Sequence, residues 1–162
     1  MPATDHHGHA HHYVRRSPAD MRAAINHARE LARQAGKSLT RQREDVLRLL
    51  LAAERPLGAY DLMARLGAEQ NKVVAPPTVY RALEFLMELG AIARIESSNE
   101  YLCCAHPGEP HDCMFLICTC CGKAMEIDPG PVAQVVDSAA GAVGFAPESR
   151  TVEIRGRCAE CR

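Results

Sequence analysis

Aromatic residues are scarce in this chain of 162 residues, and tryptophan is absent. Phe and Tyr make up only 4% of the sequence, so Leu, Val, Ala and Met must fill most of a packed core. No stretch approaches the roughly 18 consecutive apolar residues that a transmembrane helix needs, and the first residues lack the apolar centre of a signal peptide. We therefore expect no membrane span and a cytoplasmic location.

Motifs typical of enzymes are also missing. The sequence contains no H-E-x-x-H pattern for a catalytic zinc ion and no glycine-rich phosphate loop. No nucleophile with a base partner is evident either. We therefore predict that the protein is not an enzyme.

The chain has almost no net charge, but its two halves differ. Residues 14–94 contain 14 Lys or Arg and 9 Asp or Glu, whereas residues 95–162 contain 5 and 10. A basic half joined to an acidic half indicates a module for a polyanion attached to a second module. An excess of this size is also common on solvated helical surfaces, so the signal is weak by itself.

The N-terminus is rich in histidine. The segment HHGHAHH places five histidines between His6 and His12 and shows no apolar periodicity. We interpret residues 1–16 as a disordered tail. One alternative is a purification tag, although the irregular spacing argues against a standard one, and the functional interpretation is loose metal capture.

Residues 17–104 show the pattern of a winged helix-turn-helix. We expect helices over residues 18–34, 41–55, 59–66 and 76–89, and short strands over 91–95 and 100–104. Ser17 and Thr40 are candidate caps of the first two helices, and Gly67 is the expected end of the third. The fourth helix has one apolar and one largely polar face. Such a set of helices followed by a hairpin is typical of a DNA-reading domain.

The rest of the chain predicts a small unit of mixed structure. We expect strands over residues 114–117, 124–127 and 151–155 and a helix over 131–142, which makes the whole protein α+β. So short a sheet would expose an apolar face if it stood alone. We therefore expect the unit to pair with a second copy and form a homodimer.

Two C-x-x-C pairs are the strongest chemical signal. They consist of Cys118 with Cys121 and Cys158 with Cys161. Two residues between thiolates let one turn present both to a single ion, and two such turns complete a tetrahedral zinc site. The alternatives are buried thiols without a metal and a redox pair. A redox pair normally begins a helix, whereas Gly122 and a strand follow here.

A second metal site is predicted in the loop before the first pair. Cys104, His106 and His111 lie on a segment constrained by prolines, and Glu126 could add an oxygen ligand. Mixed sulfur, nitrogen and oxygen ligands suit zinc. The alternative for each histidine is an exposed loop position, and Cys103, Cys113 and Cys120 have no assigned role.

Several motifs resemble the ferric uptake regulator family, and in particular its zinc-responsive branch. They are LTRQR (residues 39–43), PPTVYRALEFLMELG (residues 76–90), the hairpin after it and FLICTCCG (residues 115–122). The resemblance covers roughly residues 22–161. It implies two zinc ions per subunit, one structural and one regulatory, and contacts with operator DNA through these residues: Arg41, Arg43, Thr78, Tyr80 and Arg81.

The resemblance also implies a ligand set for the sensing zinc, and the chain departs from it. The zinc branch uses a histidine of the first wing strand, a cysteine at the end of the second, a loop histidine and a glutamate. Cys104, His111 and Glu126 match the last three, but Ala93 stands where the first histidine is expected. We expect His106 to replace it, with water or Cys103 as alternatives.

Taken together, the sequence predicts a zinc-responsive dimeric repressor that binds palindromic operator DNA and controls zinc uptake genes. Its expected parts are the tail, a winged-helix domain over 17–104, a hinge and metal-binding loop over 105–112, and a dimerisation domain over 113–162. The alternatives are a sensor of iron, manganese or nickel from the same family, and a zinc buffer or metallochaperone.

Overall fold

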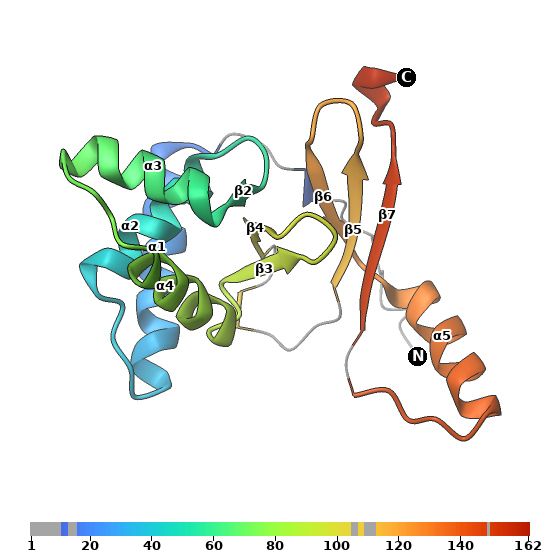
Figure 1. Cartoon of the computed structure of the whole chain (residues 1–162). Helices are drawn as coiled ribbons and strands as arrows, with labels where there is room; N and C mark the ends of the chain where they lie inside the picture. The colour runs from blue at the N-terminus through green and yellow to red at the C-terminus, as the bar shows by residue number, and fades with distance from the viewer. Residues whose placement is uncertain (1–10, 13–15, 105–106, 109–112, 149) are drawn as a thin grey trace. The chain divides into compact units, whose positions relative to one another are not determined.

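The computed structural model describes the chain except residues 1–10, 13–15, 105–106, 109–112 and 149 (Figure 1). The chain divides into two compact units. The first is Tyr13–Pro110, and the second combines Met1–His12 with His111–Arg162. No helix in the described part of the chain is long and apolar enough to cross a membrane.

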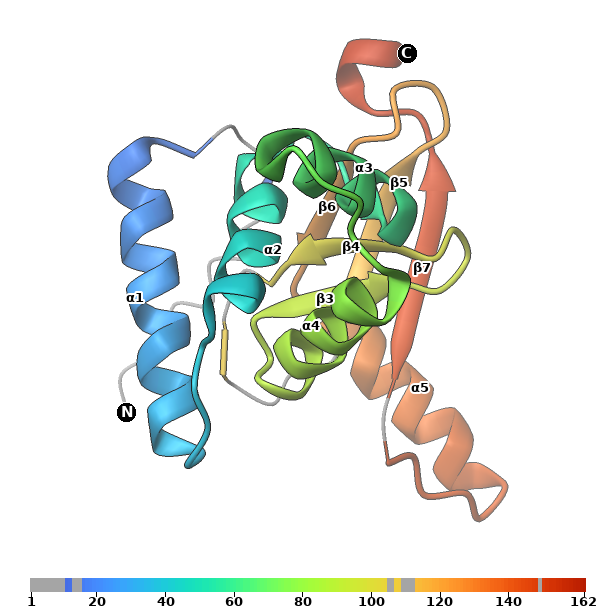
Figure 2. The same ribbon diagram turned by 60° about the vertical axis from the view of Figure 1, so that its left-hand side comes forward.

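Four helices make up most of the Tyr13–Pro110 unit. They are α1 (Pro18–Gln34), α2 (Arg41–Ala52), α3 (Ala59–Gln70) and α4 (Pro76–Glu88). Ser17 caps α1 as predicted, because its hydroxyl accepts from the Asp20 N–H at 3.2 Å while its own N–H donates to the Asp20 carboxylate at 3.2 Å. Thr40 holds the corresponding position before α2 without a capping side-chain bond. Figure 2 shows α1 running alongside α2.

Helix α3 is longer than the sequence predicts. It continues through Gly67 to Gln70, and the residue that caps it, Asn71, adopts the left-handed conformation with φ of 48°. The Gly67 carbonyl accepts from the Lys72 N–H at 3.1 Å, and a Cβ atom on Gly67 would lie 3.0 Å from the Lys72 oxygen. Gly67 therefore does not end the helix; its missing side chain lets the Lys72 backbone pack closely against it.

A small sheet completes this unit. The predicted hairpin is β3 (Ile92–Ile95) and β4 (Glu100–Cys103), paired antiparallel, with Asn99 left-handed at φ of 56° in the turn. The two-residue strand β2 (Leu57–Gly58), which was not predicted, pairs with the other edge of β4. The wing is therefore joined through β2 to the chain between α2 and α3.

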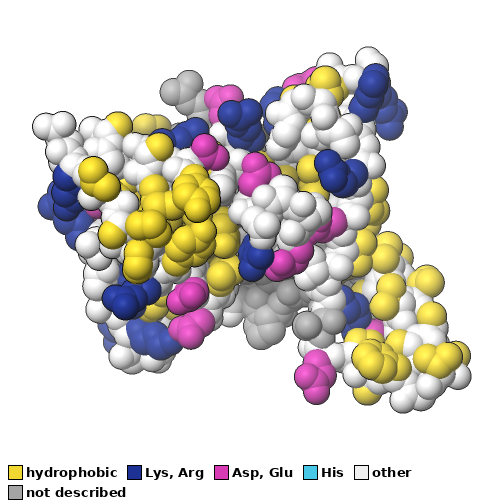
Figure 3. Space-filling model, viewed as in Figure 1, with side chains coloured by type: hydrophobic (Ala, Val, Ile, Leu, Met, Phe, Trp, Pro, Cys, Tyr) yellow, Lys and Arg dark blue, Asp and Glu magenta, His cyan; other side chains and the backbone are white. Residues whose placement is uncertain are grey.

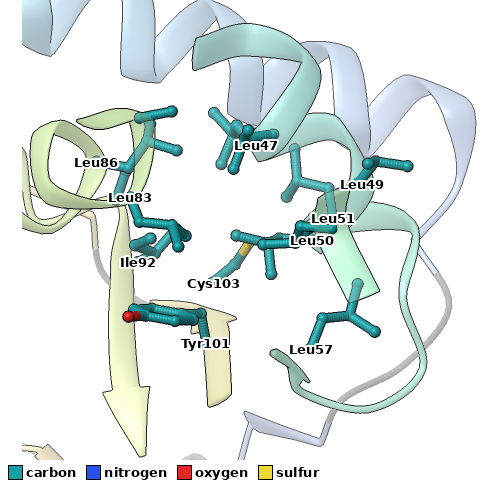
Figure 4. Packing of buried hydrophobic residues seen from close by; sticks show 14 of the residues in the cluster. Leu47, Leu49, Leu50, Leu51, Leu57, Leu83, Leu86, Ile92, Tyr101 and Cys103 are labelled. Atoms are coloured by element: carbon teal, nitrogen blue, oxygen red, sulfur yellow. The ribbon is translucent and has the colours of Figure 1, made fainter. Parts of the chain in front are cut away.

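Aliphatic side chains dominate the core of this unit, in line with the scarcity of aromatics. Leu50, Leu62 and Leu86 are fully buried, and Figure 4 shows leucines of α2 and α4 facing Ile92 and Tyr101 of the wing. Helix α4 therefore has its buried face fixed by α2 and by the wing. Its opposite face stays exposed.

The second unit is built on a four-stranded sheet. Its strands are β1 (His11–His12), β5 (Cys113–Cys118), β6 (Ala124–Ile127) and β7 (Thr151–Gly156), in the order β1-β6-β5-β7. Strand β5 pairs antiparallel with β6 and parallel with β7, and α5 (Gly130–Ala142) lies between β6 and β7 in the sequence. A 3-10 turn, η1 (Ala159–Cys161), follows β7. His11 and His12 thus form a strand and differ from the expected tail.

Apolar side chains remain exposed on and after α5. This helix buries none of its residues, and Figure 3 shows hydrophobic side chains gathered over it. Val135 is 69% exposed, Val143 is 81% exposed and Phe145 is 66% exposed. A single copy of the chain therefore leaves this apolar surface uncovered, which is unfavourable in water.

Candidate metal centre and nucleic-acid interface

Four thiols converge where β5 and β7 end. The sulfur atoms of Cys118, Cys121, Cys158 and Cys161 all lie within 4.8 Å of one another, and those of Cys121 and Cys158 are 3.8 Å apart. A tetrahedron with Zn–S bonds of about 2.3 Å has sulfur–sulfur edges of about 3.8 Å. The donor set and its spacing therefore fit a structural zinc ion. Within the part of the chain that the structure describes, no other cluster of potential metal ligands occurs.

The parallel pairing of β5 with β7 brings the two cysteine pairs together. Cys118 stands opposite Gly156 in the register, and the Gly156 carbonyl accepts from the Thr119 N–H at 2.8 Å. An ion pair of 2.7 Å between Lys123 and Glu160 joins the two turns on the outside. Residues far apart in the sequence thus meet through backbone bonds, so the thiols are placed by the sheet itself.

Backbone donors favour the metal-binding form of one of these cysteines. The pKa of Cys118 is lowered to about 6, because the N–H groups of Cys121, Cys158 and Cys120 donate to its sulfur. The pKa of Cys161 is raised, because it shares hydrogen bonds with the thiols of Cys120 and Cys158. Since metals bind thiolates, Cys118 is already in the ligand form at neutral pH, while Cys161 must lose a proton.

The structure places two of the four predicted sensing ligands. Cys104 follows β4, is buried, and donates its N–H to the Ala91 carbonyl at 3.1 Å. Glu126 lies on β6 and is only 6% exposed. The two residues belong to different units, and His106 and His111 lie outside the described residues.

Two neighbouring positions bear on the missing ligand. Ala93 lies on β3 opposite Leu102, so the wing-strand position indeed carries a methyl group instead of an imidazole. Cys103 is buried in the core, and burial raises its pKa to about 12. Its side chain is part of the apolar core cluster of the winged helix, whereas Cys104 is not part of this cluster.

Helix α1 packs against the described part of the predicted metal-binding loop. The His27 Nε2 atom lies 3.3 Å from the Pro107 carbonyl oxygen. Gly108 has φ of 83°, and a Cβ atom there would lie 2.6 Å from Leu31. The positive φ favours glycine at this position, and a methyl group there would displace the Leu31 side chain, so α1 lies against the loop shortly after Cys104.

The predicted DNA-contacting residues lie at the starts of α2 and α4. Tyr80 is 40% exposed, Arg81 and Arg41 are exposed, and Thr78 is half-buried at the first turn of α4. Arg43 differs from these, because its guanidinium lies 3.6 Å from the centre of the Phe85 ring and donates to the Ser38 carbonyl at 2.6 Å. Arg43 is thus engaged within the fold.

Sequence reasoning missed Tyr60 as a surface residue. It lies on α3 and is 78% exposed, although aromatic side chains are rare in this chain. A helical projection that turns Leu62 and Leu66 inward places Tyr60 outward, which was the signal available from the sequence.

Comparisons with known proteins agree with this architecture. Residues 34–155 match the model of the ferric uptake regulator family. The zinc uptake regulation protein of Escherichia coli (strain K12) is 37% identical over 83% of this chain and 78% of its own length. That of Mycobacterium tuberculosis (strain ATCC 25618 / H37Rv) is 28% identical over 79% of this chain and 97% of its own length.

Among solved structures, a zinc uptake regulator complexed with zinc and DNA superposes with a TM-score of 0.81 at 33% identity, covering 90% of this chain and 95% of that one. The holo form of a protein named XcZur gives a TM-score of 0.75 at 37% identity, covering 85% and 96%. The family match spans well over half of the sequence. This chain therefore belongs to the ferric uptake regulator family.

Proposed function

We propose that this protein is a zinc-responsive transcriptional repressor that binds operator DNA when zinc occupies a sensing site. The relatives named above are zinc uptake regulators, and one of them was solved with both zinc and DNA. The observation that carries the proposal is the combination of a winged helix with an exposed start of α4 and a second unit in which four thiols converge. Regulators of this family are not enzymes. We place this one in the cytoplasm, together with its operator DNA.

We assign two zinc ions to each subunit. Cys118, Cys121, Cys158 and Cys161 would hold the structural ion, which would cross-link the ends of β5 and β7. Cys104 and Glu126 would contribute to the sensing ion together with His111, and His106 is the fourth ligand expected from the sequence. Cys104 would supply a sulfur donor and Glu126 an oxygen donor, and such mixed ligands suit zinc.

The DNA contacts are proposed at one end of the winged helix. Arg81 and Tyr80 on the exposed face of α4 would reach base edges, because arginine can donate two hydrogen bonds to guanine. Thr78 and Arg41 would contact phosphates. Arg43 would serve the interface by holding Ser38 and Phe85 in place, since its guanidinium is already bonded there.

The working form is proposed to be a homodimer. The apolar surface over and after α5, with Val135, Val143 and Phe145, is the surface that a second copy would cover. A dimer presents two α4 helices, and a palindromic operator presents matching half-sites about 34 Å apart. Zinc would act as a corepressor by binding the arrangement with this spacing more tightly; converting a 1:99 population to 99:1 requires about 5.5 kcal/mol of preference.

Two other functions remain as competitors. A sensor of iron, manganese or nickel would use the same fold, and zinc competition after purification without added metal separates it from a zinc sensor. A zinc buffer or metallochaperone would use the histidine-rich segment and the cysteines as a cargo site, and it would retain no particular DNA sequence.

The test begins with selection of an operator from random double-stranded DNA by the zinc-loaded protein. Fluorescence anisotropy of that DNA is then measured against buffered free zinc. We expect affinity to rise at least tenfold with zinc, and Arg81→Ala to weaken operator binding by about 1–3 kcal/mol while leaving the zinc content unchanged. Binding that is indifferent to free zinc contradicts the proposal, and failure to enrich any sequence favours the buffer.

A further inference from the structure

The turn between α3 and α4 carries an exposed lysine, Lys72. The chain contains three lysines, and the other two are engaged: Lys37 forms an ion pair with Glu88, and Lys123 forms one with Glu160. Lys72 forms no ion pair within the part of the chain that the structure describes. A free surface cation is common in proteins, so the place of Lys72 in the fold decides what it can do.

The end of α3 holds the backbone at Lys72 in place. Asn71 adopts the left-handed conformation with φ of 48°, and the Lys72 N–H donates to the Gly67 carbonyl at 3.1 Å. The chain then enters α4 at Pro76. The Cα atom of Lys72 therefore has a fixed position shortly before the helix that is proposed to read DNA.

Lys72 lines a hollow between α2, the end of α3 and the start of α4. This hollow has a volume of about 230 Å³, and Gln42 and Thr78 also line it. A second hollow shares Gln42 and Lys72 with the first and extends to Arg41 at the start of α2. Arg41 and Thr78 are the two residues proposed above to contact DNA phosphates. Lys72 thus lies on the same surface as both of them.

The charges that line the second hollow leave this surface positive. Its two carboxylates are engaged by Arg48, which donates to Glu69 and lies 3.9 Å from the Asp45 carboxylate. Arg41 and Lys72 form no ion pair with any residue that the structure describes. Three cations thus face two carboxylates, and the two unpaired cations can meet an anion from outside.

The start of α4 offers few backbone donors to such an anion. Helix N-termini commonly bind phosphates through their free N–H groups. Pro76 and Pro77 have no N–H group, and the Thr78 N–H already donates to the Ala75 carbonyl at 3.0 Å. A DNA phosphate beside the start of α4 must therefore be held by side chains.

We propose that this surface binds one phosphate of the operator backbone, with Lys72 as the cation and the Gln42 amide as a hydrogen-bond donor. The inference rests on the proposed function and adds a contact to its DNA interface. A phosphate held beside the start of α4 would fix the position at which Arg81 meets the base edges. Because phosphates carry no sequence information, Lys72 would strengthen binding to all DNA without discriminating between bases.

The salt dependence of DNA binding tests the assignment in the full-length, zinc-loaded protein. Each phosphate contact that is lost lowers the slope of log affinity against log salt concentration by about 0.9 in magnitude. We expect Lys72→Gln to lower it by about this amount for each bound subunit. We also expect Lys72→Gln to weaken operator DNA and random DNA by the same factor.

Arg55→Gln is the matched control. Arg55 is exposed and follows the opposite end of α2 from Arg41, a helix about 18 Å long. This variant removes the same charge from the winged helix and should leave the slope unchanged. Both variants should unfold at the wild-type midpoint, because both side chains are exposed, so a change in affinity does not report a loss of fold.

A second measurement locates the phosphate. Each phosphate of one half-site in the selected operator is replaced in turn by an uncharged methylphosphonate. At the contacted position, the replacement should weaken binding by the wild type and by Arg55→Gln. It should weaken binding by Lys72→Gln little further, because that variant has already lost the contact. This non-additivity separates a direct contact from a general effect of charge.

Several outcomes overturn the inference. They are an unchanged slope in Lys72→Gln, equal slope changes in Lys72→Gln and Arg55→Gln, and additive losses at every phosphate. A loss on operator DNA without a loss on random DNA also overturns it, because Lys72 would then read a base. If the wild type enriches no operator or binds it without regard to zinc, the proposed function fails. If the wild type binds its operator in response to zinc and Lys72→Gln keeps the full slope, only this inference fails.

Discussion

Removing the Arg43 side chain should destabilise the winged helix, although the family resemblance of the sequence predicts that Arg43 contacts DNA. Its guanidinium lies 3.6 Å from the centre of the Phe85 ring, which is 5% exposed, and donates to the Ser38 carbonyl at 2.6 Å. A cation–π contact at a half-buried site contributes about 1 kcal/mol. A hydrogen bond from a charged donor adds about 1.5 kcal/mol. Arg43→Ala should therefore lower the free energy of unfolding by about 2–3 kcal/mol.

The assay is thermal unfolding followed by circular dichroism, with Arg41→Ala as the control. If the winged helix unfolds as a unit of about 100 residues, the Arg43→Ala midpoint falls by roughly 10 °C. Arg41 is exposed and makes no hydrogen bond or ion pair with the described residues, so Arg41→Ala should change stability by less than about 0.5 kcal/mol while weakening DNA binding. The reasoning is refuted if Arg43→Ala unfolds at the wild-type midpoint and loses DNA affinity as Arg41→Ala does.

Three further predictions concern other parts of the molecule. Arg81→Ala should weaken operator binding by about 1–3 kcal/mol, measured by anisotropy, and a loss of zinc in this variant would show that its helix has been misassigned. Gly108→Ala should cost about 1–3 kcal/mol in urea unfolding, because φ of 83° strains alanine and its methyl group would meet Leu31; an unchanged midpoint contradicts that packing. Zinc binding to the structural site at pH 7 should release about three protons instead of four, because the pKa of Cys118 is about 6 whereas that of Cys161 is raised. The depressed pKa of Cys118 stabilises the folded metal-free site above the thiol's ordinary pKa, and this stabilisation is lost as the pH falls through about 6. Calorimetry in buffers of different ionisation enthalpy should therefore find that zinc binding releases more protons as the pH is lowered. Release of four protons at pH 7 contradicts the assignment.

Local signals in the sequence predicted most elements of the winged helix. Ser17 and Asp20 mark the start of α1 with a capping box, and Pro76 marks the start of α4, because caps and prolines act on their own neighbours. The predicted end of α3 at Gly67 was wrong, because Gly67 lies against the Lys72 backbone, and this contact depends on how the chain turns back after the helix. Strand β2 is too short for a periodic pattern and exists because β4 offers it an edge.

The sequence predicted which residues form the structural metal site, but not how the fold brings them together. The C-x-x-C spacing predicted two cysteine pairs, Cys118 with Cys121 and Cys158 with Cys161. The two pairs come together only because β7 lies parallel to β5, and no local pattern predicts the order of strands in a sheet. No local pattern indicates that His11 stands opposite Glu126 either, because this pairing joins the N-terminus to a strand more than a hundred residues later.

The parallel pair β5–β7 also has a kinetic consequence. The winged helix consists mainly of contacts between neighbours in the sequence, whereas Cys118 and Cys158 meet only after a loop of about 40 residues has closed, which costs about 3 kcal/mol of chain entropy. The second unit should therefore complete its fold after the first. An ion that captures all four sulfurs prevents the loop from reopening, so a newly made chain would gain its lasting shape, and its resistance to proteolysis, only once it has found its first zinc.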